Sequence, residues 1–248
     1  MRKYGLIGFP LGHSFSVPYF REKFQRESIL DCSYVNFEIA SVSLLPDILK
    51  DPDLKGLNVT IPYKESVVPL LYKKDPVVEQ TGACNCIIVR QGKLSGYNTD
   101  VIGFEKSLEE KLTAKDKRAL ILGTGGSSKA VAWVLRKKGI DILWVSRKNT
   151  GAADHVRYED LDHRVMQDHS LIVNSTPLGM YPNMEEYPPI PYEYISHEHY
   201  LFDLVYNPEI TQFLTRGETT GARIKNGADM LAIQAEASWA IWNGDSVR

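Results

Sequence analysis

The glycine-rich run GTGGSSKA, at residues 123–130, constrains the fold of this chain more than any other feature. It follows the apolar run RALIL and continues into AVAWVL, so a buried strand is expected to turn sharply into a helix. Gly123, Gly125 and Gly126 have no β-carbon, which allows a tight turn and a close approach of the backbone to phosphate. With these flanks the run predicts a dinucleotide-binding unit; without them it would be an ordinary turn.

The first hundred residues alternate short apolar runs with helical patterns, which favours a β-α-β-α-β order and a mainly parallel sheet. The predicted strands are YGLIGF, SYVNFEI and GLNVTI, and the predicted helices are PYFREKFQRES, SLLPDILKD and ESVVPLLYKK. CNCIIVRQGKLSGYN predicts a hairpin with Gly92 and Lys93 at its turn.

A helix over residues 101–111 is expected to lead into a second unit. That unit has predicted strands at RALILG, DILWVSRK, SLIVNSTPLG and HYLFDLVYNP, and predicted helices at the end of GTGGSSKAVAWVLRKKG, at TQFLTRGETTG and at ADMLAIQAEASWAIWNG. Residues 149–164 are polar and irregular, so the second crossover is expected to be poorly helical or shortened. We predict a two-domain α/β protein: an α/β catalytic domain over residues 1–102 and 226–248, which the last helix rejoins, and a Rossmann domain over residues 103–225.

Two further runs, NVTIPYK and GYNTD, place Lys64 and Asp100 after predicted strands. Ligands of open parallel sheets collect at the carboxyl ends of strands, so both residues are candidates for one site. A cationic lysine beside a carboxylate can move the proton that accompanies hydride transfer to a carbonyl. Taken separately, each residue is equally compatible with an ordinary surface charge.

The strand DILWVS ends in Ser146, Arg147 and Lys148, where an NAD-binding unit would usually carry an acidic residue. Two cations at this position suit a 2′-phosphate, so NADP is preferred over NAD. The alternative is a solvated basic turn.

GFPLGHSFS places Ser14 and Ser16 at alternate positions, so both hydroxyls would point the same way if the segment were extended. Such a pair could bind a carboxylate, although serines in a loop more often serve the turn itself. For His13 we favour a structural role.

Composition and charge bear on which binding partners and which location are expected. The net charge is −2, which provides no overall attraction to nucleic acid or to an anionic membrane. Cys32, Cys84 and Cys86 are odd in number and lack metal-site spacing, so we expect reduced thiols, no metal and a cytoplasmic location. The start of the chain does not resemble a signal peptide, and no run approaches the roughly 20 apolar residues that span a bilayer. We expect a monomer or homodimer.

Taken together, these runs resemble the shikimate dehydrogenase family over nearly the whole chain. The shared motifs, in family order, are GFPLGHSFS, NVTIPYK, GACN followed by GYNTDVIGF, GTGGSSKA, NSTPLGM, DLVYNP and NGADMLAIQA. The resemblance implies reversible NADPH-dependent reduction of 3-dehydroshikimate to shikimate, on the route to chorismate and the aromatic amino acids, with substrate in the cleft between the domains.

The resemblance also implies roles for individual residues. Lys64 and Asp100 match the catalytic pair. The residues matching the substrate site are Ser14, Ser16, Thr60, Asn85, Tyr206 and Gln234. Those matching the cofactor site are Gly123, Thr124, Gly125, Gly126 and Ser127 for the pyrophosphate, Ser146, Arg147 and Lys148 for the ribose phosphate, and Leu204 and Gly227 near the nicotinamide.

The chain departs from the family pattern at several positions. Val17 separates Ser16 from Pro18, and Phe20 and Arg21 replace the usual His-Asn pair, so the family pattern does not define the path of the loop after the first strand. Cys86 stands in place of a common Thr, Ser127 and Ser128 in place of an Ala pair, and Asp229 in place of a common Gly. None of these changes removes a residue assigned to the chemistry.

Three alternatives remain open from the sequence. A quinate/shikimate dehydrogenase that also uses NAD is the nearest, and Arg147 and Lys148 argue against it. A non-catalytic NADP-binding sensor is disfavoured by the intact Lys64 and Asp100. A methylene-tetrahydrofolate dehydrogenase shares the two-domain layout, but the serine pair and Gln234 suit a small polar acid better.

Overall fold

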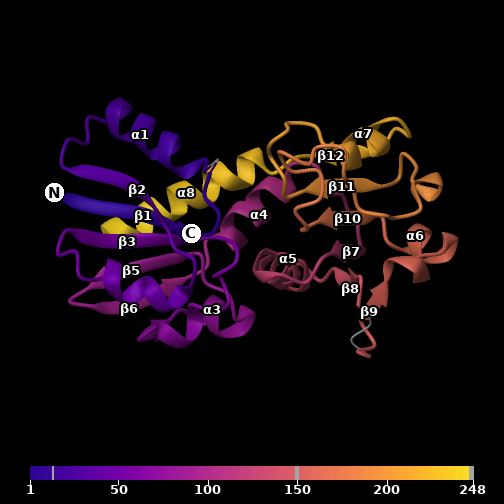
Figure 1. The fold of residues 1–248 in the computed structure, drawn as a ribbon. Helices are drawn as coiled ribbons and strands as arrows, with labels where there is room; N and C mark the ends of the chain where they lie inside the picture. The colour runs from indigo at the N-terminus through magenta and orange to yellow at the C-terminus, as the bar shows by residue number, and fades with distance from the viewer. Residues whose placement is uncertain (13, 149–150, 246–248) are drawn as a thin grey trace. The chain divides into compact units, whose positions relative to one another are not determined.

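The computed structural model describes residues 1–12, 14–148 and 151–245, so His13 and the start of the 149–164 segment lie outside the described residues. The chain folds into two compact units (Figure 1). The first contains Met1–Thr99 and Gln234–Arg248, and the second contains Asp100–Ile233. The boundaries fall within helices or at their ends, since helix α4 (Asp100–Glu109) begins the second unit and helix α8 (Ala228–Asn243) runs from the second unit into the first.

The first unit is built on a six-stranded sheet in the order β2-β1-β3-β5-β6-β4. Strands β1, β2 and β3 are mutually parallel, β5 is antiparallel to β3 and β6, and β4 is parallel to β6. The strand bounds are β1 Arg2–Gly8, β2 Cys32–Glu38, β3 Leu54–Val59, β4 Lys73–Lys74, β5 Cys86–Arg90 and β6 Lys93–Tyr97. The helix bounds are α1 Ser16–Arg26, α2 Leu45–Ile48 and α3 Pro76–Thr81. The predicted β-α-β-α-β order and mainly parallel pairing are confirmed.

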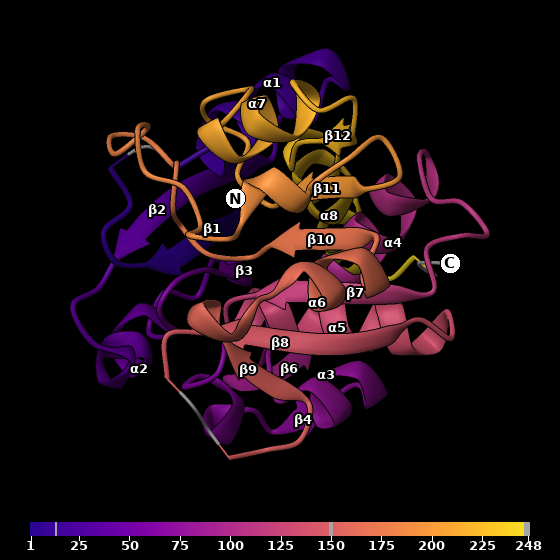
Figure 2. The same ribbon diagram turned by 90° about the vertical axis from the view of Figure 1, so that its right-hand side faces the viewer.

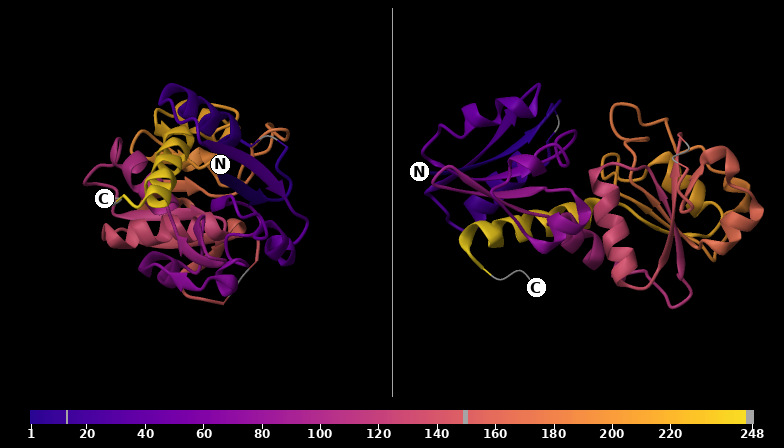
Figure 3. Two further views of the ribbon diagram at one scale, coloured as in Figure 1. Left: turned by 90° about the vertical axis from the view of Figure 1, so that its left-hand side faces the viewer. Right: turned by 90° about the horizontal axis from the view of Figure 1, so that it is seen from below.

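Helices α1 and α8 cover one face of this sheet (Figure 3). Aromatic side chains form much of the core on that face. Trp242 of α8 stacks on Tyr4 of β1 with ring centroids 4.7 Å apart, and its indole nitrogen donates to the Ile87 carbonyl at 3.0 Å. A β-carbon at Gly56 would lie 2.3 Å from Trp242 Nε1, so glycine is required for this close packing. The end of α8 therefore packs against the first sheet.

Two local predictions for the first unit are wrong. ESVVPLLYKK does not form an α-helix but a 3₁₀ turn at Val68–Leu70 followed by β4. Pro69 cannot donate a helical hydrogen bond, and its ring restricts the preceding residue. The β5–β6 hairpin exists, but its two-residue turn is Gln91 and Gly92, both with positive φ, and Lys93 pairs with Arg90 inside the strands. Positive φ at both turn positions is the geometry that matches the twist of a hairpin.

The second unit is a six-stranded parallel sheet in the order β12-β11-β10-β7-β8-β9, visible from top to bottom in Figure 2. The strand bounds are β7 Arg118–Leu122, β8 Asp141–Ser146, β9 His155–Arg157, β10 Leu171–Asn174, β11 Tyr200–Asp203 and β12 Arg223–Lys225. The helix bounds beyond α4 and α8 are α5 Gly126–Lys137, α6 His163–Asp168 and α7 Gln212–Glu218. Counted from β7, the spatial order is 3-2-1-4-5-6, the doubly wound order of dinucleotide-binding domains.

Strands β9 and β12 were not predicted from the sequence, because each is only three residues long and partly exposed. Residues 149–164 were expected to be irregular, but the described part of that segment forms β9, a 3₁₀ turn at Tyr158–Asp160 and the start of α6. None of the helices in residues 1–12, 14–148 and 151–245 combines the length and apolar character needed to span a bilayer.

Candidate functional site

Three predicted site residues, Thr60, Lys64 and Asp100, follow the ends of β3 and β6 in the chain. Thr60 directly follows β3 and donates its amide to the Ile7 carbonyl at 2.9 Å. Lys64 is half-buried in the turn beyond, and its carbonyl accepts the Cys84 amide at 2.8 Å. Asp100 is buried and is the first residue of α4, directly after Thr99. Lys64 and Asp100 belong to different units, so their action as a pair stays a prediction.

Asn85 and Gln234 are brought together from distant parts of the sequence. Asn85 Nδ2 donates to Gln234 Oε1 at 3.3 Å and to Thr99 Oγ1 at 2.9 Å. Asn85 Oδ1 accepts the Thr99 amide at 2.6 Å. All three side chains are buried, and buried amides keep a fixed orientation only when their hydrogen-bonding groups are partnered. The two predicted substrate residues are therefore held in a defined geometry before any ligand binds.

Sequence reasoning missed the polar residues that support this pair. Ser238, one helical turn after Gln234 on α8, contacts Thr99 Oγ1 at 3.1 Å and accepts Asn58 Nδ2 at 2.9 Å. Asn58 Oδ1 in turn accepts the Tyr34 hydroxyl at 2.9 Å. A signal was present, because Asn58 and Thr99 lie inside the runs NVTIPYK and GYNTD. The partners Tyr34 and Ser238 could not be identified, since only the fold brings them together.

The predicted geometry of Ser14 and Ser16 is wrong, although the two residues are close. Phe15 between them has helical backbone angles, and Ser16 is the first residue of α1. The Ser16 amide donates to Ser14 Oγ at 3.3 Å, so the segment turns instead of extending. Val17 and Pro18 fall in the first turn of α1, where proline needs no amide partner. The two serines therefore lie at the start of a helix. The argument that their hydroxyls share a direction required an extended segment, and the segment is not extended.

In the second unit, the glycine-rich turn joins β7 to α5 as predicted. Gly123 has a φ of +102°, and a β-carbon there would lie 3.0 Å from Ser175 Oγ and Thr176 Cγ2. A β-carbon at Gly125, the residue that caps α5, would meet nothing within 4 Å. Thr124 and Gly125 are exposed, and Gly126 and Ser127 are half-buried at the start of the twelve-residue helix.

This turn suits a pyrophosphate. It lies after β7, next to the point where the strand order reverses between β7 and β10, which is where doubly wound sheets bind dinucleotides. The amides and dipole at a helix start favour an anion, and glycine as capping residue leaves no side chain over the first turn. Ser128, in place of the family's usual alanine, is buried and donates its hydroxyl to the Gly125 carbonyl, so its polarity is accommodated within the turn.

Ser146, Arg147 and Lys148 follow at the carboxyl end of β8, the strand beside β7. Ser146 Oγ donates to the Lys148 carbonyl at 2.6 Å, which folds the three residues into a tight turn. Arg147 and Lys148 are both exposed. The structure thus presents two exposed cations beside the glycine-rich turn, and their role at a 2′-phosphate stays a prediction.

Leu204 and Gly227 meet at the carboxyl end of β11. A β-carbon at Gly227 would lie 2.2 Å from the Leu204 carbonyl oxygen, so no side chain fits. The Gly227 amide donates to the Val205 carbonyl at 3.1 Å. Tyr206, the remaining predicted substrate residue, is half-buried two residues beyond Leu204.

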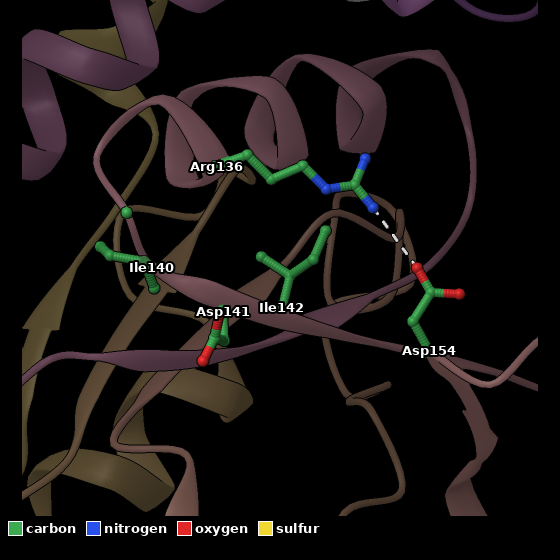
Figure 4. A pocket seen from close by; sticks show the side chains of 6 residues that line it. Arg136, Ile140, Asp141, Ile142 and Asp154 are labelled. Carbon is green, nitrogen blue, oxygen red and sulfur yellow. Dashed lines mark hydrogen bonds and ion pairs between the residues drawn. The ribbon is translucent and has the colours of Figure 1, made fainter.

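A separate surface hollow of about 310 Å³ lies at the other end of the second sheet (Figure 4). Arg136, Gly139, Ile140, Asp141, Ile142 and Asp154 line it, and none of them is a predicted site residue. Arg136 pairs with Asp154 at 3.3 Å across it. Because Asp141 begins β8, the hollow is at the amino end of the strands, away from the edge at which parallel sheets bind ligands. We assign it no part in the site.

The order of the second sheet, its glycine-rich turn and the basic turn after β8 define a two-unit α/β protein with a Rossmann dinucleotide-binding unit. Residues 6–87 match the family model described as the shikimate dehydrogenase substrate binding domain. A shikimate dehydrogenase (NADP(+)) from Methanosphaera stadtmanae is 36% identical over 257 residues, which cover 97% of this chain and 90% of that protein. The chain therefore belongs to the shikimate dehydrogenase family.

Solved structures agree on the fold and differ in ligand. Shikimate 5-dehydrogenase from Thermus thermophilus, in complex with NADP(H) and shikimate, matches with a TM-score of 0.86 at 29% identity. The match covers 98% of this chain and 94% of the Thermus chain. Quinate dehydrogenase from Corynebacterium glutamicum, in complex with NAD, also has a TM-score of 0.86, at 25% identity and the same coverage. Because both structures have the same TM-score, the fold alone does not distinguish between these substrates and cofactors. The distinction must come from individual residues.

Proposed function

We propose that this protein catalyses the reversible, NADPH-dependent reduction of 3-dehydroshikimate to shikimate in the biosynthesis of chorismate and aromatic amino acids. One observation carries the proposal: this chain, a member of the family, combines two features. They are a buried Asn85–Gln234 pair in the first unit and a glycine-rich strand–turn–helix in the second. The first supplies oriented amides for a polyhydroxylated acid. The second supplies the site of a dinucleotide.

Substrate binds through the polar residues of the first unit and through Tyr206. Ser14 and Ser16 donate to the carboxylate from the start of α1, where the helix dipole also favours an anion. Thr60, Asn85 and Gln234 contact the ring hydroxyls or the carboxylate. Because Asn85 and Gln234 are already fixed by Thr99, little conformational entropy is lost when substrate binds.

Lys64 and Asp100 carry the proton transfer. In the reducing direction the Lys64 ammonium donates to the C3 carbonyl oxygen and transfers a proton as the C3 hydroxyl forms. Asp100 orients the lysine and accepts a hydrogen bond from the same hydroxyl. In the oxidising direction the lysine amine takes the proton back. Bound NADP(H) supplies the hydride donor or acceptor, held by residues 123–127 at the pyrophosphate, by Ser146, Arg147 and Lys148 at the ribose phosphate, and beside Leu204 and Gly227 at the nicotinamide.

The direct test is the absorbance of reduced nicotinamide when purified protein is mixed with shikimate and NADP. Parallel reactions with NAD and with quinate separate the alternatives. Signal with shikimate and NADP is the expected result. Comparable signal with quinate and NAD would favour the quinate/shikimate dehydrogenase. Binding of NADP without signal from either acid would favour the sensor.

Arg147 provides a sharper test of cofactor choice. Replacing it with alanine removes a charged hydrogen bond to the 2′-phosphate, so Arg147→Ala is expected to weaken NADP binding by about 1.5 to 3 kcal/mol, or roughly 10- to 150-fold, while NAD binding is unchanged. Both dissociation constants are measured by titration calorimetry. Arg164→Ala, an exposed arginine on α6, is the matched control. Equal losses for NADP and NAD would remove Arg147 from the phosphate site.

Gly227 tests the nicotinamide end. A β-carbon 2.2 Å from the Leu204 carbonyl forces backbone to move, so Gly227→Ala is expected to lower kcat/KM for NADP about tenfold or more through misplacement of the reacting groups. Gly139→Ala is the control, because Gly139 has a φ of +70° with open space around it, so alanine there is strained but far from the cofactor residues. A Gly227→Ala enzyme as active as Gly139→Ala would refute the close-approach argument.

We also propose a cytoplasmic monomer or homodimer. Cys32, Cys84 and Cys86 form no disulfide within the described residues, which supports a reducing compartment. Light scattering coupled to gel filtration would establish the mass in solution, and a trimer or larger assembly would contradict the proposal.

A further inference from the structure

Asp203 is a fully buried acidic residue at the carboxyl end of β11 that the mechanism above does not use. Its Oδ1 accepts Asn174 Nδ2 at 3.0 Å and the Val205 amide at 3.0 Å. Its Oδ2 accepts the Thr211 hydroxyl at 2.6 Å. We call Asp203, Asn174 and Thr211 the Asp203 clamp. It joins the ends of β10 and β11 to the residue that caps α7.

The clamp maintains a carboxyl group where burial disfavours its charge. Burial raises the pKa of Asp203 to about 7, although hydrogen bonds from Thr211, Val205 and Asn174 act in the opposite direction. An apolar residue at this position would avoid the cost of burying a carboxyl group. The three directed hydrogen bonds of Asp203 therefore indicate a role that an apolar residue could not fill.

The clamp fixes the backbone of two turns. The Leu204 amide donates to the Asn174 carbonyl at 2.9 Å, and the Val205 amide reaches Asp203 itself. Asn174 Oδ1 also accepts the Thr176 amide at 3.1 Å and its hydroxyl at 2.7 Å. The turn after β10 and the turn after β11 are thus held by one set of side chains, at the edge of the sheet that binds ligands.

We propose that the Asp203 clamp is a positioning device for the nicotinamide, which fixes the turn Leu204–Tyr206 against Gly227. The inference rests on the proposed function, which assigns Leu204 to the nicotinamide and Tyr206 to the substrate. Asp203 touches neither ligand and acts through the turn that follows it. The location of Asp203 favours this role over simple stabilisation. Asp203 lies at the carboxyl end of the strands, where parallel sheets bind ligands, whereas Asp116, another buried carboxylate, lies before β7 at the opposite end.

The test compares Thr211→Val, which removes the hydroxyl from Asp203, with Thr211→Ser, which retains it. Thr215→Val is the matched control, since Thr215 is exposed on the same helix and its hydroxyl donates to the Thr211 carbonyl, at 3.0 Å, and not to Asp203 among the hydrogen bonds of the described residues. The measurements are kcat, the isotope effect with shikimate deuterated at C3, the affinity for adenosine 2′,5′-bisphosphate, and the melting temperature.

Thr211→Val is expected to lower kcat about tenfold or more and to raise the isotope effect, because misplaced reacting atoms slow the hydride step. Its affinity for adenosine 2′,5′-bisphosphate should stay within about twofold of wild type, since the hydroxyl that is removed donates to Asp203 and not to residues 123–127 or 146–148. Thr211→Ser should restore kcat. A lowered melting temperature with unchanged kcat and isotope effect would mean that the clamp only stabilises the fold, and would overturn the proposal.

Failure of the proposed function gives a different result. In that case wild-type protein does not oxidise shikimate, and the clamp is tested by the emission of bound NADPH, which reports the nicotinamide environment. Thr211→Val should then change that emission while adenosine 2′,5′-bisphosphate binds as in wild type. Identical emission from both proteins, or no NADPH binding by wild type, would overturn the inference.

Discussion

Lys64→Ala is expected to lower kcat for shikimate oxidation by about a hundredfold or more while shikimate affinity changes little, as is typical when an acid–base group is removed. Lys64 is half-buried in the turn after β3, and the turn is anchored by its own carbonyl, which accepts the Cys84 amide at 2.8 Å. Alanine retains that carbonyl, so the turn should persist. Steady-state kinetics and equilibrium titration with shikimate separate the two effects.

Two further variants make the result specific to proton transfer. Lys64→Arg keeps the positive charge but not a group that readily gives up its proton, so it should be nearly as slow as alanine. Lys55→Ala is the control, because Lys55 is an exposed lysine on β3 whose ammonium contacts only the Pro52 carbonyl among the hydrogen bonds of the described residues. Turnover near the wild-type value in Lys64→Ala would exclude Lys64 from the mechanism, and full activity in Lys64→Arg would reduce its role to charge.

Patterns that depend on neighbouring residues were predicted well from the sequence. The strand–turn–helix at Gly123 and the parallel β1–β2–β3 core follow from apolar runs and glycine positions, and both are present. Failures arose where one residue outweighed a pattern. Pro69 disfavours the α-helix that the apolar spacing of ESVVPLLYKK predicts, and only a 3₁₀ turn forms there. Gln91 takes a positive φ that residue type alone does not favour.

The site shows the same limit at longer range. Asn85 and Gln234 were assigned from motifs, but the hydrogen bonds among Thr99, Ser238 and Asn58 require the fold, because Asn58 and Ser238 are 180 positions apart in the chain. Asp203 lay within a quoted motif, DLVYNP, yet nothing in its neighbours shows that its partners are Asn174 and Thr211. Sequence position identifies polar residues near strand ends, whereas packing decides which of them meet.

Asp116→Ala is expected to destabilise the second unit by about 3 kcal/mol, the lower end of the cost of breaking a buried ion pair. Asp116 is 2% exposed and accepts Arg223 Nη1 at 3.0 Å and Nη2 at 2.9 Å. It also accepts Ser170 Oγ at 2.9 Å and the Thr113 amide at 2.8 Å. The lower end applies because the Arg223 side chain is 26% exposed and can be partly hydrated once its partner is lost. Denaturant unfolding of the second unit, followed by a probe within it, measures the change.

The pH dependence of that change distinguishes the ion pair from packing alone. Burial by itself would raise the pKa of Asp116, but hydrogen bonds from Arg223, Thr113 and Ser170 outweigh it and lower the pKa. A depressed pKa means that the stabilisation is fully present above the ordinary carboxyl range of about 4 and is lost as the pH falls through the folded value. The difference between wild type and Asp116→Ala should therefore be largest at neutral pH and shrink in acid. Glu198→Ala, which breaks the exposed pair with Lys115, should change stability far less than Asp116→Ala does. A difference for Asp116→Ala that stays constant from neutral pH into acid would show that the carboxylate's charge contributes nothing and that its volume alone fills the site.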